Sequence, residues 1–244
     1  QSVLDAVRRA SNAGVVVVVS AGNGGDGSDP DIDPNQPDPF AADLVGAGNG
    51  NVIIAGSIDE DGDMSSFANR AGDQATAFIN ARGERICCVH EDGEVYVESI
   101  NGAEFVTLFS GTSFAAPQVS GAVALLKQAF PNLTGQEIVE ILLDSARDAG
   151  ASGIDPVYGT GILDIAAAFA PAGSTSIAGT KARMSLGDTI AVGSAAMGNA
   201  LDNARLSTIV TDKYGRAYSY ELGLHTRNSA QMQRLRGAVQ QGGM

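Results

Sequence analysis

Residues 111–121 read Gly-Thr-Ser-Phe-Ala-Ala-Pro-Gln-Val-Ser-Gly, and the small and apolar residues after Ser113 predict a buried helix. Ser113 would lie in the first turn of that helix, where unpaired backbone N–H groups and the positive end of the helix dipole favour developing negative charge. A serine nucleophile needs such donors, because its attack on a carbonyl group creates an oxyanion. The simpler interpretation is that Ser113 only caps the helix, since serine is a favoured N-cap residue.

The composition describes a globular protein. The chain has 244 residues, of which 44% are hydrophobic and 18% charged, enough for one large domain or for a large domain with a small appendage. Its 28 acidic and 15 basic residues give a net charge of −13, which argues against nucleic acid or an anionic membrane as a partner. No apolar run reaches the roughly 18 residues of a membrane-spanning helix. Cys87 and Cys88 are neighbours, so they are expected to be unpaired thiols or a buried strand pair.

The first part of the chain alternates helical and strand patterns. Residues 3–13 have apolar groups at helical spacing, and the five valines at 15–19 predict a strand buried on both faces, as in parallel sheets. Residues 52–58 predict a second buried strand. Asn23 follows the first strand, at the carboxyl edge where functional groups collect in open parallel sheets. Taken alone, Asn23 is better explained as an ordinary turn residue, because asparagine is common in turns.

Two of these stretches resemble subtilisin-like serine proteases. Residues 111–121 contain every fixed position of the family's Gly-Thr-Ser-x-Ala-x-Pro-x-Val-x-Gly motif, and residues 16–23 resemble the segment that ends in the oxyanion-hole asparagine. The resemblance implies that Ser113 is the nucleophile and that the Asn23 side chain and the Ser113 backbone N–H hold the oxyanion. It also implies that Ala21 and Gly22 line the pocket for the substrate side chain that precedes the scissile bond.

Three further segments carry weaker resemblances. Residues 65–72 resemble Ser-x-Phe-Ser-Asn-x-Gly, with Ala68 in place of the second serine and Ala71 inserted, and no catalytic role is assigned to them. Residues 81–86 resemble Ala-Pro-Gly-x-x-Ile with Arg82 in place of proline, and residues 158–164 resemble the Tyr-Gly-x-Gly segment that closes the domain. The fold expected over residues 1–172 is therefore α/β: a partial, three-layer, parallel-sheet subtilisin-like fold.

The base of the catalytic triad has no candidate in this sequence. The chain order in subtilisins is Asp, His, Asn, Ser, but no histidine precedes Asn23. We therefore expect the triad Asp and His on an upstream segment or a separate chain, and we interpret a sequence that begins with Gln1 as a piece of a longer or processed polypeptide. His90 and His225 lack the expected context and are not predicted to replace the base. The isolated chain is predicted to be inactive.

The middle of the chain supports three local predictions. Residues 26–40 contain four prolines and five aspartates; the spacing is not that of an EF-hand, so a solvated loop fits better, and a structural calcium ion is the alternative that the resemblance adds. No cofactor is otherwise required.

Asn101-Gly102 between residues 94–99 and 104–109 predicts a hairpin. Thr134 and Glu137 form a capping-box pattern that opens a helix to about residue 148.

Residues 173–244 are predicted to form a linker and a β-rich extension, with alternating stretches at 181–186, 206–210 and 216–222. Residues 212–218 resemble, more weakly, the segment that joins a subtilisin-like passenger to its outer-membrane domain in bacterial autotransporter proteases. That resemblance implies a secreted protein or one at the bacterial cell surface or outer membrane.

Two functions follow from these observations. The first is a serine endopeptidase that acts on protein or peptide substrates through an acyl-enzyme, with the nucleophile and oxyanion hole in this chain. The second is a non-catalytic relative that keeps the fold as a structural or binding module, although Ser113 and Asn23 are both intact. An α/β-hydrolase is disfavoured, because no Gly-x-Ser-x-Gly surrounds Ser113 and no suitable histidine follows it.

Overall fold

The computed structural model describes residues 2–88, 90–180, 182–184, 186, 191–192, 207–221 and 226–227. The chain divides into two compact units, Gln1–Ala170 and Pro171–Met244. Of the positions discussed above, Gln1, Lys181, Ser185, Leu206, Leu222 and His225 lie outside the described residues, as does the side chain of His90.

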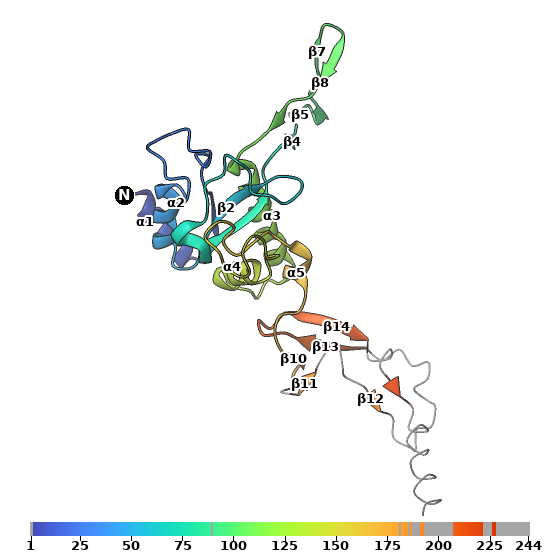
Figure 1. The fold of residues 1–244 in the computed structure, drawn as a ribbon. Coiled ribbons are helices and arrows are strands. Elements are labelled where there is room, and N and C mark those ends of the chain that lie inside the picture. The colour runs from blue at the N-terminus through green and yellow to red at the C-terminus, as the bar shows by residue number, and fades with distance from the viewer. Residues whose placement is uncertain are drawn as a thin grey trace, which may run out of the picture. The chain divides into compact units, whose positions relative to one another are not determined.

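A three-stranded parallel sheet forms the centre of the first unit (Figure 1). Its strands are β1 (Val17–Ser20), β2 (Val52–Ile58) and β3 (Phe78–Arg82), in the order β1-β2-β3. The middle strand β2 is buried along its whole length, as its sequence predicted. The edge strand β1 is only half-buried, so the prediction of a strand covered on both faces is wrong for the valine run. Among the described residues, no strand pairs with the outer edge of β1.

Two short helices cover one face of this sheet. Helix α1 (Val3–Asn12) opens with a capping box between Ser2 and Asp5, and α2 (Pro39–Ala47) is capped by the side chain of Asp38. A buried cluster joins α2 to the sheet; its members are Ala21, Ala41, Ile54, Ala71 and Phe78. A 3-10 helix, η1 (Gly72–Ala77), leads into β3.

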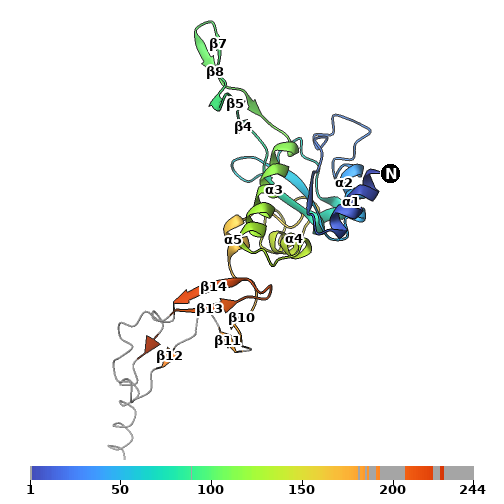
Figure 2. The same cartoon turned by 180° about the vertical axis from the view of Figure 1, so that it is seen from behind.

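The long helix α3 (Thr112–Ala129) packs across all three strands (Figure 2). Because neighbouring residues of a strand face opposite ways, Ile53 and Ile79 point away from α2, and both are fully buried on the face that α3 covers. One stripe of α3 is buried: Thr112, Ala115, Val119, Ala122 and Leu126. The opposite side is exposed in the described structure, with Leu125 at 48%, so the predicted buried helix is buried along one stripe only.

Two further helices complete the first unit. Helix α4 (Gly135–Asp144) begins with the predicted capping box, in which the Thr134 side chain accepts the Glu137 N–H and the Glu137 carboxylate accepts the Thr134 N–H. It ends at Asp144, earlier than the predicted residue 148. Helix α5 (Ile165–Phe169) follows, and the ring of Phe169 lies 5.9 Å from that of Phe130.

Residues 86–109 form an arm that extends away from the sheet (Figure 1). It consists of three successive antiparallel pairs: β4 (Ile86–Cys87) with β9 (Leu108–Phe109), β5 (His90–Glu91) with β6 (Glu94–Val95), and β7 (Glu98–Ile100) with β8 (Ala103–Phe105). Asn101 and Gly102 both have positive φ, 52° and 81°, as a tight hairpin turn requires. The predicted hairpin is therefore confirmed, although its strands are shorter than expected.

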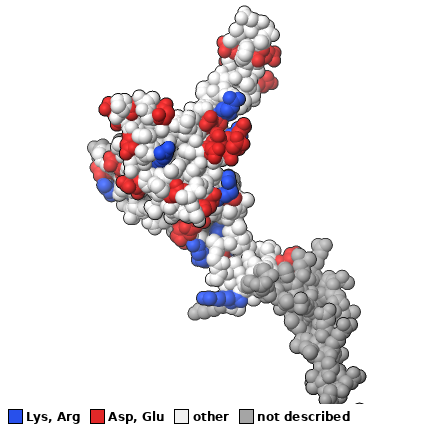
Figure 3. All heavy atoms as spheres, in the orientation of Figure 1, with Lys and Arg blue, Asp and Glu red and all other residues white. Residues whose placement is uncertain are grey.

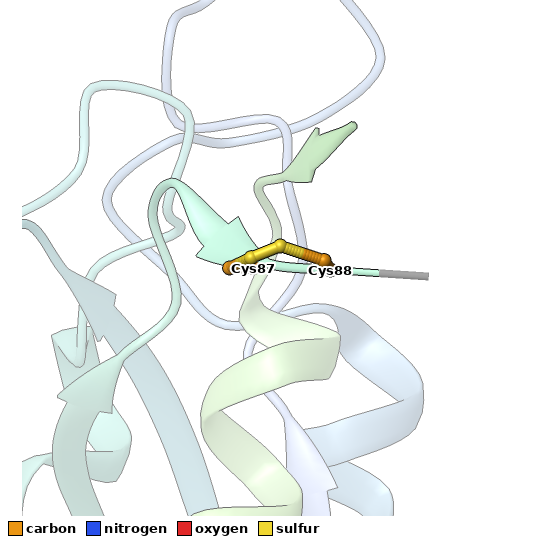
Figure 4. Close-up of a disulfide and its surroundings, with 2 residues drawn as sticks. All are labelled: Cys87 and Cys88. Carbon is orange, nitrogen blue, oxygen red and sulfur yellow. A yellow bond between two sulfur atoms is a disulfide. The ribbon is translucent and has the colours of Figure 1, made fainter. Parts of the chain in front are cut away.

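The two cysteines lie at the base of this arm, where the structure joins Cys87 to Cys88 in a disulfide (Figure 4). The prediction of unpaired thiols or a buried strand pair is wrong in both respects. Because the chain leaves the β4–β9 pair at Cys87, neither cysteine is buried.

The second unit contains a four-stranded antiparallel sheet in the order β11-β10-β13-β14. Its strands are β10 (Thr175–Ile177), β11 (Arg183–Met184), β13 (Ser207–Thr211) and β14 (Ala217–Glu221). Two short strands, β12 (Ala191–Val192) and β15 (Thr226–Arg227), pair in parallel. The described part of the chain contains no helix long and apolar enough to cross a membrane.

A buried ion pair fixes the turn between β13 and β14. Oδ2 of Asp212 accepts hydrogen bonds from Nε and Nη2 of Arg216, both at 2.8 Å, and Oδ1 accepts the N–H groups of Tyr214 and Arg216. Arg216 is 1% exposed, and its guanidinium carbon lies 5.6 Å from the ring centres of both Tyr214 and Tyr218. Stacked and paired in this way, the guanidinium forms the centre of the turn.

Replacing Asp212 by Asn should destabilise this unit by about 3–5 kcal/mol, because it removes the negative charge of the buried Asp212–Arg216 ion pair. Urea unfolding, monitored by tyrosine fluorescence, measures this loss of stability. The protein has no Trp, and Tyr214, Tyr218 and Tyr220 belong to this unit. Arg183→Lys, a change at an exposed residue of β11, is the control and should leave the transition unchanged. Equal midpoints for D212N and the unaltered protein would contradict the prediction.

Tyr218 should make the folded unit sensitive to alkali. Burial raises the pKa of the Tyr218 phenol to about 12; Asp212 adds to this rise, whereas Arg216 opposes it. A raised pKa means that the neutral phenol contributes stability that is complete below about pH 10 and is lost as the pH rises through about 12. When tyrosinate absorbance is followed as the pH rises, a late step at high pH should appear, and Tyr218→Phe should remove it. Tyr96→Phe is the control for the loss of one phenol. A late step that survives in Y218F would refute the assignment.

Candidate active site

The carboxyl ends of the three parallel strands place the predicted site residues at one edge of the sheet. The loop of residues 21–25 continues directly from β1 and contains Gly22 and Asn23. Gly22 has φ +108°, and a Cβ at this position would lie 3.1 Å from the side chain of Asn69. Both the backbone conformation and the space therefore require glycine next to Asn23.

Hydrogen bonds from Thr112 set the orientation of the Asn23 side chain. Oδ1 of Asn23 accepts the Thr112 backbone N–H at 2.9 Å and the Thr112 hydroxyl at 2.9 Å. Because the backbone N–H can only donate, the amide oxygen must face Thr112 and the NH₂ group is left to donate elsewhere. The two segments that meet here are 89 residues apart in the sequence.

Ser113 follows Thr112 in the first turn of α3, after the N-cap residue Gly111. Its side chain is exposed, and neither its Oγ nor its backbone N–H forms a hydrogen bond with the described residues. An unpaired N–H at the start of an 18-residue helix is a ready donor for an anion. The site thus brings together a hydroxyl, a helix N-terminus and an oriented amide, which are the groups that acyl transfer requires on the nucleophile side.

Asn69 braces the Asn23 loop, a role that the sequence did not reveal. Its buried side chain accepts the Gly24 N–H at 2.7 Å and donates to the Gln36 carbonyl at 2.9 Å, while its backbone N–H donates to the Gly22 carbonyl at 3.1 Å. The resemblance at residues 65–72 assigned no catalytic role to this segment. The sequence did contain a signal for this role, because that motif includes an asparagine. Which segment the asparagine holds is known only from the fold.

Gly83 joins the end of β3 to the start of α3. Its carbonyl accepts the Gly111 N–H at 2.8 Å, and its N–H donates to the Ile58 carbonyl at 3.1 Å. A Cβ at position 83 would lie 2.5 Å from Oγ of Ser57 and 2.7 Å from the Gly111 carbonyl oxygen. This close approach explains the glycine of the Ala-Arg-Gly segment and fixes the backbone just before Ser113.

The predicted substrate-pocket residues lie in the same loop. Ala21 is fully buried and packs in the core cluster, whereas Gly22 is half-buried. Their role in holding a substrate side chain stays a prediction. A cavity of about 820 Å³ lies at the other edge of the sheet, lined by Gly50, Val52 and Ala77 near the amino ends of β2 and β3 and by residues of α4. It is not part of the Ser113 site.

The described residues contain no candidate base and no cluster of three or more acidic, histidine or cysteine side chains placed to bind a metal ion. The protein has two histidines, and the side chain of His90 and the whole of His225 lie outside the described residues. No group of three or more His, Cys, Asp or Glu side chains in the described ranges could hold a metal ion. Asp26, Asp29 and Asp33 instead each accept the backbone N–H two residues later, which builds the turns of the 26–40 loop.

Comparisons with known proteins identify the family of the chain. The model of the subtilase family, peptidase S8, matches residues 1–161. Mycosin-1 of Mycobacterium tuberculosis is 36% identical over 169 residues, which cover 64% of this chain and 36% of mycosin-1. An extracellular serine protease of Serratia marcescens is 28% identical over 175 residues, 67% of this chain and 16% of that protein. The chain therefore spans about a third or less of these relatives.

Two further matches cover a shorter stretch of the sequence or compare the structure. The autotransporter lipoprotein NalP of Neisseria meningitidis is 46% identical over 55 residues, 22% of this chain and 5% of NalP. The self-cleaved protease domain of PatA has a TM-score of 0.45 and 28% identity, covering 68% of this chain and 53% of that domain.

Removing the Asn69 side chain should loosen the Asn23 loop. Asn69→Ala leaves the Gly24 N–H without its acceptor and the Gln36 carbonyl without its donor, so we expect a loss of about 1–3 kcal/mol in the free energy of unfolding. Hydrogen exchange at Gly24 should become faster than in the unaltered protein. Asn12→Ala, at an exposed asparagine at the end of α1, is the matched control. Unchanged protection at Gly24 in N69A would argue against the brace.

Proposed function

The chain belongs to the subtilase family, and we propose that it is the nucleophile-bearing part of a serine endopeptidase. The observation that carries the proposal is the pair of hydrogen bonds from Thr112 to Oδ1 of Asn23, at 2.9 Å each. They direct the Asn23 NH₂ group outward, next to a serine whose N–H and hydroxyl are unpaired within the described structure. A helix cap alone would not need a fixed amide beside it.

The proposed reaction is acyl transfer. Ser113 Oγ attacks the carbonyl carbon of a peptide bond while a histidine outside this chain removes the hydroxyl proton. The carbonyl oxygen becomes an oxyanion that accepts hydrogen bonds from Asn23 Nδ2 and the Ser113 N–H. The same histidine then returns the proton to the leaving amine, and water releases the acyl group from Ser113. By this proposal Ala21 and Gly22 shape the pocket for the residue before the scissile bond.

The uncovered surfaces support a missing segment that supplies the Asp and His. The exposed side of α3 presents small residues, among them Ala116, Ser120 and Ala124, at a spacing that lets another helix approach closely. The outer edge of β1 forms no hydrogen bond with the described residues, whereas the outer edge of β3 pairs with Gly161 and Leu163 through Asn80. A helix on α3 and a strand on β1 would bury both surfaces and place new side chains beside Ser113.

The setting that we propose is outside the cell or at the bacterial surface. It rests on the names of two relatives, an extracellular serine protease and an autotransporter lipoprotein, and on the weak resemblance at residues 212–218. Protein or peptide substrates follow from the family. A structural calcium ion in the 26–40 loop remains a proposal supported by the resemblance alone, and a calcium-dependent unfolding transition would be its test.

The alternative is a subtilase relative that has kept the fold and lost the reaction, used as a structural or binding module. The oriented amide of Asn23 and the unpaired N–H of Ser113 favour the peptidase, because a structural module would not need either group preserved. The two functions differ in one measurable property, the reactivity of Ser113.

A fluorophosphonate probe tests the proposal directly. The chain expressed alone should not be labelled, whereas the polypeptide extended upstream of Gln1 to include the triad segment should be labelled at Ser113. Ser113→Ala should abolish the label, and Asn23→Ala should slow labelling and hydrolysis by about 10²–10³-fold, the loss known for the oxyanion-hole amide of subtilisin itself. Asn12→Ala is the control for an asparagine outside the site.

Two outcomes would contradict the proposal. Labelling of the isolated chain at Ser113 would show that the base lies within it. An extended polypeptide that folds but is never labelled would support the non-catalytic relative instead.

A further inference from the structure

The arm of residues 86–109 exposes an unusual amount of apolar surface. Seven of its large apolar side chains are 39–52% exposed: Val95, Tyr96, Val97, Ile100, Phe105, Val106 and Leu108. Contiguous apolar surface of this kind marks interaction sites more often than it marks inert surface. In addition, a two-stranded hairpin is only marginally stable by itself, so a bound partner would stabilise the arm.

One face of the β7–β8 hairpin combines apolar and acidic groups. Glu98 lies opposite Phe105 and Ile100 lies opposite Ala103, and residues that face each other across an antiparallel pair share a face. All three residues of each strand are exposed. The outer edges of both strands are unpaired among the described residues, so an extended peptide could add to either edge as a further strand.

The charge of the arm limits the chemistry of its partner. Residues 86–109 contain five acidic residues, namely Glu91, Asp92, Glu94, Glu98 and Glu104, and no Lys or Arg. Figure 3 shows acidic and uncharged atoms along the arm. A partner that complements this surface carries basic and apolar side chains. A second copy of the arm would bring the same negative charge, which disfavours pairing between copies.

The arm is fixed to the nucleophile at its base. The ring of Phe109 stacks on that of Phe114 at 5.6 Å, and Phe114 is the residue after Ser113. The Arg85 N–H donates to Oγ of Ser110 at 3.1 Å, and the Gln118 side chain donates to the carbonyl oxygens of Arg82 and Phe114. The base of the arm therefore contacts the first turns of α3, next to Ser113.

We propose that the arm is a substrate-binding exosite that recognises an extended, basic and apolar stretch of the polypeptide to be cleaved, at a distance from the scissile bond. This inference rests on the proposed peptidase function, because it assigns the occupant of the arm to the substrate. It predicts a preference for long substrates that carry Lys or Arg among apolar residues. It also predicts that binding weakens as salt screens the acidic side chains.

The test measures binding without turnover, in the Ser113→Ala form of the upstream-extended polypeptide. Fluorescence anisotropy gives the Kd for three labelled peptides. The first is long and has alternating basic and apolar residues that flank a cleavable centre. The second is the same peptide with Glu in place of each basic residue, and the third is the centre alone. We expect the long basic peptide to bind most tightly. The double substitution Glu98→Lys and Phe105→Ser should weaken binding of the long basic peptide by roughly tenfold. It should leave the affinity for the short peptide unchanged.

The matched control combines Asp43→Lys with Ile154→Ser, since both residues are exposed and lie outside the arm. Replacement of residues 97–106 by two glycines is a second arm variant, which keeps the contact between Phe109 and Phe114. Equal Kd values for the arm and control variants, or tighter binding of the acidic peptide, would overturn the exosite. A dimer in sedimentation that only the arm variants dissociate would also overturn it, in favour of an interface between copies.

Failure of the exosite and failure of the peptidase proposal are distinguishable. Binding by the arm does not need a base, so it is measurable even if Ser113 proves unreactive towards the fluorophosphonate. Conversely, labelling of Ser113 together with identical peptide affinities for all variants would leave the peptidase intact and remove the exosite.

Discussion

The contact between Thr112 and Asn23 is the interaction on which the site depends. It joins the loop after β1 to the first turn of α3, and it fixes which end of the Asn23 amide faces outward. The remaining local structure supports this contact: Asn69 holds the loop from one side, and Gly83 holds the backbone before α3 from the other. Without these supports the amide and the helix N-terminus would be two unrelated polar groups on loops.

The contact can form because the sheet is parallel. In a parallel sheet the carboxyl ends of β1, β2 and β3 meet at one edge, so Asn23, Ser57 and Gly83 are neighbours although they are far apart in the sequence. Helix α3 crosses the same sheet with its N-terminus at that edge, which adds the positive end of its dipole. The positions of the functional groups thus follow from strand direction, and the buried Ala115 and Ala122 let α3 pack closely on the sheet.

Much of this arrangement could be predicted from the sequence. The β2 strand, the capping box at Thr134 and the Asn101-Gly102 turn each depend on neighbouring residues, so local patterns indicated them correctly. The burial of β1 and α3 depends on what packs against them, and five consecutive valines look the same at an edge as in the middle of a sheet. The brace by Asn69 was missed for the same reason, since its partners Gly24 and Gln36 are distant in the sequence.

The two kinds of exposed apolar surface in the first unit have different physical origins. The open side of α3 consists largely of small side chains, which gain little from burial individually and are suited to a closely packed, permanent neighbour. The arm instead presents large side chains such as Tyr96 and Phe105 beside carboxylates, on strands with free edges. Large rings and edge hydrogen bonds suit a partner that binds and leaves, because a few such contacts give affinity without a continuous core. These differences fit the two proposals: a helix that packs permanently on α3, and a substrate that binds the arm.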